Sequence, residues 1–313
     1  MSGSDSMDGN DADPLSARPG TWAGDVAGKS RVRPGTLYVV ATPLGNLRDV
    51  TLRGLDVLAS ADVVAAEDTR VTARLLSHYG ITTRTLSLHA HNEAARTQDL
   101  VARLAAKESV ALVTDAGTPA VSDPGARLVR AAHEAGHPVV AVPGASAVTA
   151  AVSVAGLRAD AFVFAGFPPA QAKARRAWLD AVARLPAAVV MYEAPHRVQA
   201  TVADIVASFG EARALVVARE ITKAFETVAR MPLADAIAWF AEDANRLRGE
   251  FVLIVDTLEE EEAAPVALDE DAERWLAALL GELPPSRAAR VVASVTGVPR
   301  DVVYARAMKI KPA

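Results

Sequence analysis

The sequence predicts an α/β fold of two α/β domains with a cleft between them, followed by a small C-terminal helical module. From Thr36 onward, short apolar runs alternate with helical stretches, which is typical of a mostly parallel sheet covered on both faces. A junction at 156–160 separates a second alternating set from the first. The acidic run 259–262, followed by Ala263-Ala264-Pro265, indicates a linker to a helical C-terminus.

The first domain is expected at 34–156. Each of its expected strands is a short apolar run bounded by turn residues, which is the pattern of a buried strand. In the helix that follows Asn92, Leu100, Val101 and Leu104 recur at helical spacing, with Asn92 as the cap. The expected strands are 37–40, 63–66, 85–88, 110–114 and 139–142, and the expected helices are 52–59, 71–78, 94–106, 126–135 and 147–154.

The second domain is expected at 157–258 by the same alternation. Its strands are predicted at 162–165, 188–192, 214–218, 226–229 and 251–255, and its helices at 173–184, 198–209 and 233–242. After the linker 259–267, the module 268–313 reads as helices separated by turns at 281–285 and 297–299. Residues 1–33 are rich in Gly, Ser, Asp and Ala and are expected to be a disordered extension.

Composition excludes several classes of protein. The chain has 313 residues, of which 51% are hydrophobic, so it is long enough for two domains with a substantial core. Its net charge of -5 gives no global attraction for polyanions, so nucleic-acid binding needs a local basic patch. The absence of Cys excludes disulfides, iron–sulfur clusters and thiolate zinc sites and fits a reducing compartment. No run approaches the roughly 20 apolar residues of a membrane span, so we expect a cytoplasmic protein without a membrane partner.

Four loops rich in Gly, Pro, Asp and hydroxyl residues follow successive strands of the first domain. They lie at 41–46, 66–70, 114–125 and 143–147, and the third reads Thr-Asp-Ala-Gly-Thr-Pro-Ala-Val-Ser-Asp-Pro-Gly. Each alone is equally well explained as an ordinary turn. Because the carboxyl ends of parallel strands meet at one sheet edge, the four together predict a shared ligand pocket there. The P-loop and Gly-x-Gly-x-x-Gly patterns are absent, which argues against a P-loop hydrolase or an ordinary dinucleotide dehydrogenase.

The end of the chain is locally basic. From Pro284 onward a single acid, Asp301, stands against six basic residues, Arg287, Arg290, Arg300, Arg306, Lys309 and Lys311. This asymmetry fits either a solvated helical appendage or a small RNA-facing module.

Several motifs together resemble one known family. They are Thr42-Pro-Leu-Gly-Asn46, Ala66-Glu-Asp-Thr-Arg70, Leu88-His-Ala-His-Asn-Glu93, the loop 114–125, Tyr192-Glu-Ala-Pro-His-Arg197, Ala218-Arg-Glu-Ile-Thr-Lys223 and Gly249-Glu-Phe-Val-Leu253. In this order, over about 35–256, they resemble the small-subunit ribosomal RNA 2'-O-ribose methyltransferases designated methyltransferase I, which have the tetrapyrrole-methylase fold. The long Asp-Ala-Gly-Thr-Pro segment is the most specific, whereas the Pro-Gly-Ala-Ser turn is shared more widely. The extension 1–33 is not part of the family's pattern.

The resemblance implies a homodimeric, cytoplasmic enzyme that uses S-adenosylmethionine. Its acceptor would be the ribose 2'-hydroxyl of a cytidine in the decoding region of 16S rRNA, in the small ribosomal subunit, and its donor would lie in the interdomain cleft. Carried over by position, donor contacts would come from Pro43, Leu44, Gly45, Asp115, Thr118, Pro119, Val121, Ser146, Ala147, Tyr192 and Arg219. Asp115 and Asp123 either cap helices or contact the donor, and for Asp123 the cap is favoured.

Methyl transfer from a sulfonium requires no metal or covalent intermediate, because the leaving group is already activated. Catalysis therefore depends mainly on alignment of the two bound reactants. A base or a cation near the acceptor hydroxyl would add about 10²-fold to 10⁴-fold. The candidates are Glu67, Asp68, His89 and Lys223, and the sequence leaves open which of them deprotonates the hydroxyl.

Each of these candidates also has a structural explanation. For Glu67 and Asp68, an ion pair with Arg70 together with a helix cap is an equally good explanation. His89 and His91 fit RNA contact or polar packing better than a metal site, because no further ligand set is evident. Two explanations also remain for the basic residues Arg197, Arg219, Lys173, Arg175 and Arg176. They either bind phosphates or have structural roles, with the last three on a solvated helix face and an arginine at a strand end in an ion pair.

Two other functions remain open from sequence. A donor pocket does not define its acceptor, so a methylase of the same fold acting on a tetrapyrrole precursor is the closest rival. A non-catalytic ribosome-binding factor with a relic pocket is the other.

Overall fold

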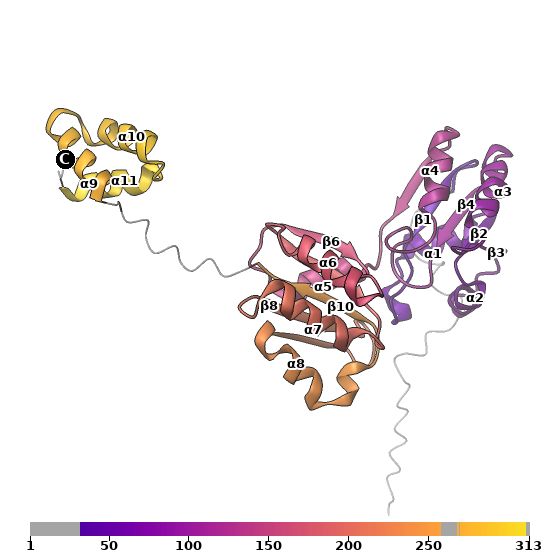
Figure 1. The fold of residues 1–313 in the computed structure, drawn as a ribbon. Helices are drawn as coiled ribbons and strands as arrows, with labels where there is room; N and C mark the ends of the chain where they lie inside the picture. The colour runs from indigo at the N-terminus through magenta and orange to yellow at the C-terminus, as the bar shows by residue number, and fades with distance from the viewer. Residues whose placement is uncertain (1–31, 258–267, 269, 311–313) are drawn as a thin grey trace, which may run out of the picture. The chain divides into compact units, whose positions relative to one another are not determined.

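The computed structural model describes residues 32–257, 268 and 270–310, and the expected extension and linker lie almost wholly outside them. The chain divides into two compact units between Thr257 and Leu258 (Figure 1). The first unit contains two five-stranded sheets, and the second is helical. No helix within the described residues is long and apolar enough to cross a membrane. The predicted α/β fold with a C-terminal helical module is confirmed.

The first sheet has the strand order β3-β2-β4-β1-β5, and all of its pairings are parallel. Its core alternates along each strand: Val64 and Ala66 pack with one cluster, while Val63 and Ala65 pack with the other. Helices α1 and α2 cover the first of these faces, and α3 and α4 cover the second. The strands are β1 (Leu37–Val40), β2 (Val63–Ala66), β3 (Thr85–Ser87), β4 (Val110–Val113) and β5 (Val139–Val142), and the helices are α1 (Leu52–Ser60), α2 (Thr69–His78), α3 (Glu93–Ala105) and α4 (Ala126–Glu134).

The second sheet has the order β6-β7-β10-β8-β9 and is mixed: β6 and β7 are parallel, and the other pairings are antiparallel. The loop 220–226 is short enough to join β8 to β9 as a hairpin, which explains the antiparallel pair. Helices α6, α7 and α8 cover one face. The elements are β6 (Phe162–Gly166), α6 (Ala172–Val182), β7 (Ala188–Glu193), α7 (Val198–Phe209), β8 (Ala214–Arg219), β9 (Thr227–Pro232), α8 (Leu233–Glu242) and β10 (Phe251–Val255).

Helix α5 (Ala147–Ala155) connects the two sheets. The sequence places it in the first domain, but Val148, Ala151 and Ala155 pack with Val216 and Ile254 on the free face of the second sheet. Because α5 begins directly after the last loop of the first sheet, it fixes that loop against the second sheet.

The C-terminal unit is a three-helix cluster with its own small core. Its helices are α9 (Glu270–Glu282), α10 (Pro285–Thr296) and α11 (Arg300–Ile310), and its core includes Leu276, Val292 and Val303. Arg306 is paired with Glu273, whereas Arg287, Arg290, Arg300 and Lys309 are exposed.

Candidate active site

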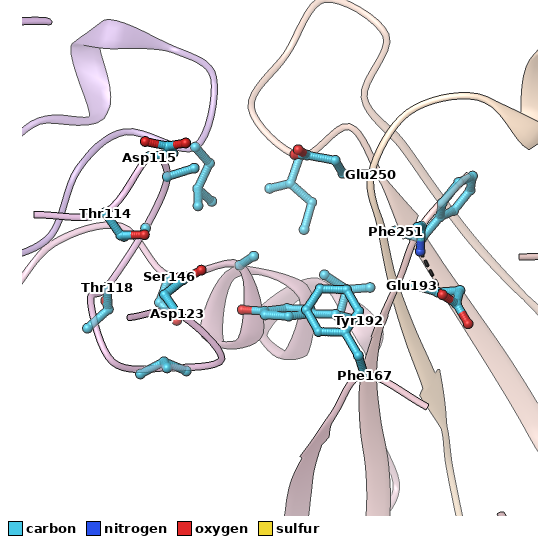
Figure 2. A pocket seen from close by; sticks show the side chains of 18 of the residues that line it. Thr114, Asp115, Thr118, Asp123, Ser146, Phe167, Tyr192, Glu193, Glu250 and Phe251 are labelled. Atoms are coloured by element: carbon cyan, nitrogen blue, oxygen red, sulfur yellow. Dashed lines mark hydrogen bonds between the residues drawn. The ribbon is translucent and has the colours of Figure 1, made fainter. Parts of the chain in front are cut away.

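A pocket of about 420 Å³ lies where the strand ends of the first sheet meet the second sheet (Figure 2). The first domain contributes residues that follow β1, β2, β4 and β5, as the loop pattern predicts. The second domain contributes residues at the ends of β7, β8 and β10 and Phe167 after β6. Its lining consists of Leu44, Glu67, Thr114, Asp115, Ala116, Gly117, Thr118, Val121, Asp123, Ser146, Ala147, Phe167, Tyr192, Glu193, Ala194, Pro195, Ala218, Ile221, Glu250, Phe251 and Val252.

All four loops are tied together by hydrogen bonds, and the loop after β2 joins the loop after β4 through the Thr114 hydroxyl, which donates to Glu67 at 2.6 Å. Thr42 and Gly117 exchange backbone hydrogen bonds, each with N···O 2.9 Å, which joins the loop after β1 to the loop after β4. The Thr42 hydroxyl donates to the carbonyl of Thr114 at 3.0 Å. The Thr118 hydroxyl donates to the carbonyl of Ala145 at 3.0 Å, which adds the loop after β5. The pocket wall is therefore held in place before any ligand binds.

The charged residues that line the pocket are all acidic. They are Glu67, Asp115, Asp123, Glu193 and Glu250, and the described lining contains no Lys, Arg or His. Glu193 is neutralised locally, because Arg197 pairs with it at 3.3 Å and Thr201 donates to it at 2.5 Å. Glu250 is paired with Lys223 at 2.9 Å. The first-domain carboxylates therefore give the wall its negative charge.

Burial disturbs the ionisation of two of these carboxylates. Burial, and then the charge of Glu67, raise the pKa of Asp123 to about 6. Burial likewise raises the pKa of Asp115. Tyr192 extends from the second domain toward Ser146 and Asp123 (Figure 2), and burial followed by the charge of Asp123 raises its pKa to about 12. A positively charged ligand would relieve this crowding of negative charge.

The structure brings together most, but not all, of the expected site residues. The expected donor residues that line the pocket are Leu44, Asp115, Thr118, Val121, Ser146, Ala147 and Tyr192, and Glu67 lines it among the expected catalytic residues. Outside the lining are Pro43, Gly45, Pro119, Arg219, Asp68, His89 and Lys223.

Glu67 and Asp68 have different roles, although they are adjacent in sequence. The Glu67 carboxylate accepts a hydrogen bond from the Thr114 hydroxyl at 2.6 Å and faces the pocket. Asp68 is the N-cap of α2 and pairs with Arg70 at 2.6 Å, and this pairing lowers the pKa of Asp68 to about 2. Asp68 thus has the capping and ion-pairing role that the sequence left open.

Lys223 crosses from the second domain to the loop after β1. Its ammonium pairs with Glu220 at 2.8 Å and with Glu250 at 2.9 Å. Its stem lies against Gly45, where a Cβ would come within 2.4 Å of the Lys223 Cγ atom, so only glycine allows this approach. Burial alone would lower the pKa of Lys223, but the hydrogen bonds to both carboxylates outweigh burial and raise it. Lys223 therefore stays charged and is unsuited to accept a proton.

The other outlying candidates have local contacts. His89 follows β3, its backbone N–H donates to the Asn92 side chain at 2.8 Å, and its ring makes an edge contact with that of His91. Within the residues that the structure describes, no group of three or more His, Cys, Asp or Glu could hold a metal ion. The Arg219 guanidinium donates to the carbonyls of Phe225 and Arg248, each at 3.1 Å.

The prediction that Asp123 caps the following helix is wrong. Helix α4 has Gly125 as its N-cap, and no side chain of its own caps it. Glu93, at the start of α3, instead accepts from the backbone N–H of Gly125 at 2.9 Å and of Arg127 at 3.2 Å. An acceptor from a neighbouring helix thus replaces the local cap, and Asp123 is left facing the pocket.

Sequence reasoning missed the second-domain wall apart from Tyr192. Phe167, Glu193, Glu250 and Phe251 line the pocket but were not expected there. Phe167 contacts the Tyr192 ring with centroids 5.4 Å apart (Figure 2). One signal could have found Phe167 and Glu193: each lies at or just after the end of a strand, as the first-domain loops do.

Comparisons with known proteins agree with the fold. Residues 36–237 match the family described as Tetrapyrrole (Corrin/Porphyrin) Methylases, and residues 266–311 match the RsmI C-terminal HTH domain. Among solved structures, uroporphyrin-III-C-methyltransferase from Thermus thermophilus has a TM-score of 0.52 at 22% identity, over 71% of this chain and 94% of that one. The methyltransferase CobJ has a TM-score of 0.55 at 20% identity, with the same two coverages. These matches define a methyltransferase of the tetrapyrrole-methylase fold.

Sequence relatives identify the family within that class. Ribosomal RNA small subunit methyltransferase I of Escherichia coli O157:H7 is 46% identical over 275 residues, which is 88% of this chain and 95% of the relative. The protein of the same name from Vibrio cholerae is 47% identical, over 86% of this chain and 92% of the relative. The chain belongs to the ribosomal RNA small subunit methyltransferase I family, and its methyl donor is S-adenosylmethionine. The resemblance predicted from the motifs is confirmed.

The residues of the pocket fit that donor. A volume of about 420 Å³ is in the range of small-molecule sites. S-adenosylmethionine carries a sulfonium and an ammonium, and the first-domain wall offers carboxylates to both. Leu44, Val121 and Phe167 would supply apolar surface for the adenosyl group, and Thr118 and Ser146 would supply hydroxyls. When bound, the donor supplies a methyl group on a leaving group that is already activated.

Proposed function

We propose that this protein methylates the ribose 2'-hydroxyl of a cytidine in the decoding region of 16S rRNA. The observation that carries the proposal is the acidic, cation-free wall of the described pocket, which suits the sulfonium donor and repels a polyanion. The acceptor would therefore present one sugar to the pocket and keep its phosphates outside. The names of the matched relatives support small-subunit rRNA as the acceptor.

Glu67 is the proposed proton acceptor. Of the four expected catalytic residues it alone lines the pocket. Its carboxylate is fixed by the Thr114 hydroxyl, which keeps the second oxygen free to accept a proton from an incoming hydroxyl. Positioning of sugar and donor by the tied loops supplies most of the acceleration, as expected for a displacement with an activated leaving group.

RNA phosphates need cations outside the pocket. The exposed Arg287, Arg290, Arg300 and Lys309 of the C-terminal unit are suited to this role, and we propose that this unit contacts the rRNA. The protein would then act in the cytoplasm, where its acceptor lies.

We further propose that the protein is a homodimer. Strand β6 is at the edge of the second sheet and exposes Phe162 and Val163, and apolar residues on an edge strand are typical of a covered surface. Light scattering should give twice the mass of one chain. A monomer at micromolar concentration would contradict this proposal.

The direct test supplies methyl-labelled donor with three acceptors: small ribosomal subunits, free rRNA and tetrapyrrole precursors. We expect label only on assembled or nearly assembled subunits, in an alkali-resistant dinucleotide, because a 2'-O-methyl group blocks alkaline cleavage. Label on the tetrapyrrole precursor would replace the proposed acceptor with the rival one. Donor binding without transfer to any acceptor would favour a ribosome-binding factor.

An E67Q variant tests the proton acceptor. At saturating donor it should transfer at least a hundredfold more slowly than the wild type. E108Q is the matched control and should leave transfer unchanged, because Glu108 precedes β4 whereas the pocket residues follow it. Transfer by E67Q at the wild-type rate would remove Glu67 from the mechanism.

A further inference from the structure

The loop 220–226 displays a large aromatic side chain to solvent. Phe225 is 74% exposed, the largest exposed fraction among the large hydrophobic residues that the structure describes. Burying an aromatic ring is strongly favourable, so a partner that covers the Phe225 ring would gain binding free energy.

The exposure is not the result of a loose loop. Glu220 and Thr222 have positive φ, at 52° and 67°, which costs free energy for residues other than glycine. The loop is nevertheless held by backbone bonds from Lys223 to Glu220 at 3.0 Å and from Glu226 to Lys223 at 3.1 Å. The Glu226 side chain also accepts from the backbone N–H of Thr222 at 2.5 Å. A strained conformation fixed by this many contacts is typical of a functional loop.

Arg219 joins Phe225 to a second exposed group. One of its terminal nitrogens donates to the carbonyl of Phe225 and to the Thr227 hydroxyl, both at 3.1 Å. The other donates to the carbonyl of Arg248 at 3.1 Å. The Arg248 side chain is exposed, and no described residue pairs with its guanidinium. Arg219 thus holds the backbones of Phe225 and Arg248, whose side chains are both exposed.

This surface adjoins the rim of the pocket. Ile221, in the same loop as Phe225, lines the pocket, and so does Glu250, two residues after Arg248. Glu220 accepts from the backbone N–H of Glu250 at 2.9 Å, which joins the two segments. Gly249 makes this contact possible, because a Cβ there would lie 2.4 Å from the Glu220 Cγ atom.

We propose that Phe225 and Arg248 form an acceptor platform for single-stranded RNA, on which Phe225 stacks a nucleobase next to the methylated nucleotide and Arg248 contacts a phosphate. The inference rests on the proposed function and names the residues that hold its acceptor. RNA is the occupant that the charges favour, because the pocket wall is acidic and a polyanion must be held by cations at the rim. Aromatic rings stack single-stranded bases with little sequence preference, and an adjacent cation fixes the backbone.

The test compares F225A, F225W and R248A with the wild type in full-length protein. F225A should raise the KM for small subunits at least tenfold, and F225W should restore it, because stacking needs an aromatic ring. R248A should raise the same KM and reduce the salt dependence of RNA binding by about one counterion. The donor Kd, measured by calorimetry, should stay within twofold in every variant. I237A, which truncates another exposed hydrophobic residue, should behave as wild type.

Three results would overturn the platform. The first is a subunit KM for F225A within twofold of wild type. The second is a loss of donor affinity in F225A as large as the rise in its subunit KM. The third is a shift from dimer to monomer in light scattering, which would make this surface an interface between copies of the chain.

A second measurement separates this inference from the proposed function. If wild type methylates no subunit, the proposed function fails, and fluorescence anisotropy with a labelled single-stranded RNA oligonucleotide still tests the platform. F225A should weaken that binding and F225W should restore it. Equal binding by wild type and F225A would contradict the platform.

Discussion

Replacing Asp123 with Asn separates the charge of the pocket from its shape. Burial and the charge of Glu67 raise the pKa of Asp123 from 3.8 to about 6. At 1.36 kcal/mol per pKa unit this corresponds to an upper limit of about 3 kcal/mol, and solvent screening of this partly exposed group reduces it to about 1 kcal/mol. The ionised carboxylate therefore destabilises the free protein by roughly that amount.

The pH dependence follows from the direction of the shift. Between pH 3.8 and about 6 the folded state binds the Asp123 proton more tightly than the unfolded state does. This group's contribution to the free energy of unfolding therefore falls as pH rises through that window, and the full destabilisation is present above it. At pH 7.5, D123N should melt about 2–4 °C above the wild type, and the difference should shrink toward pH 4.

Donor binding should change in the opposite direction. S-adenosylmethionine carries a sulfonium, whereas S-adenosylhomocysteine has a neutral thioether at the same position. By calorimetry at pH 7.5, D123N should lose about tenfold more affinity for the first than for the second, because only the sulfonium interacts with the lost charge. D180N, an exposed carboxylate on α6, is the control for both measurements. A D123N protein that is no more stable at pH 7.5, or that loses both affinities equally, would refute the reasoning.

Three further substitutions test the supports of the site. E93A removes the acceptor from the N-terminus of α4 and should cost about 1 kcal/mol in urea unfolding while raising the donor KM, because the loop 114–125 ends there. G249A should cost about 1–2 kcal/mol more than G210A, because both have positive φ but only Gly249 has a side chain against it. E193A should cost about 3 kcal/mol by leaving Arg197 without its buried partner.

Each of these expectations has a contrary outcome. An unchanged donor KM in E93A would mean that the cap does not position the loop. Equal losses in G249A and G210A would assign the effect to backbone conformation alone. An E193A protein as stable as wild type would show that the Arg197 side chain finds solvent at little cost.

The parts of the fold that are local in sequence were predictable. The central strands β2 and β4 are four-residue apolar runs, fully buried on both faces, and such runs indicate parallel strands. The loops after β1, β4 and β5 have turn residues directly behind those runs, which placed the pocket at the correct sheet edge. The motifs shared with the family predicted seven donor-contact residues, and Glu67, that line the pocket.

Contacts between distant segments were not predictable. Helix α5 is composed of Ala, Val, Thr and Ser and has no marked polar face, so nothing in its sequence shows which sheet it covers. Asp123 stands where a cap is expected, but Glu93 from another helix takes that place. The approach of Lys223 to Gly45 likewise depends on how the two domains pack, and no local pattern encodes it.

Photo-crosslinking most directly tests the central claim that the acidic pocket holds the methyl donor. The protein is irradiated with methyl-labelled S-adenosylmethionine, digested, and its labelled peptides are sequenced. Label should appear in the segments 114–125, 146–147 or 192–195, and an excess of unlabelled S-adenosylhomocysteine should abolish it. Saturable label confined to peptides that contribute nothing to the pocket would contradict the account.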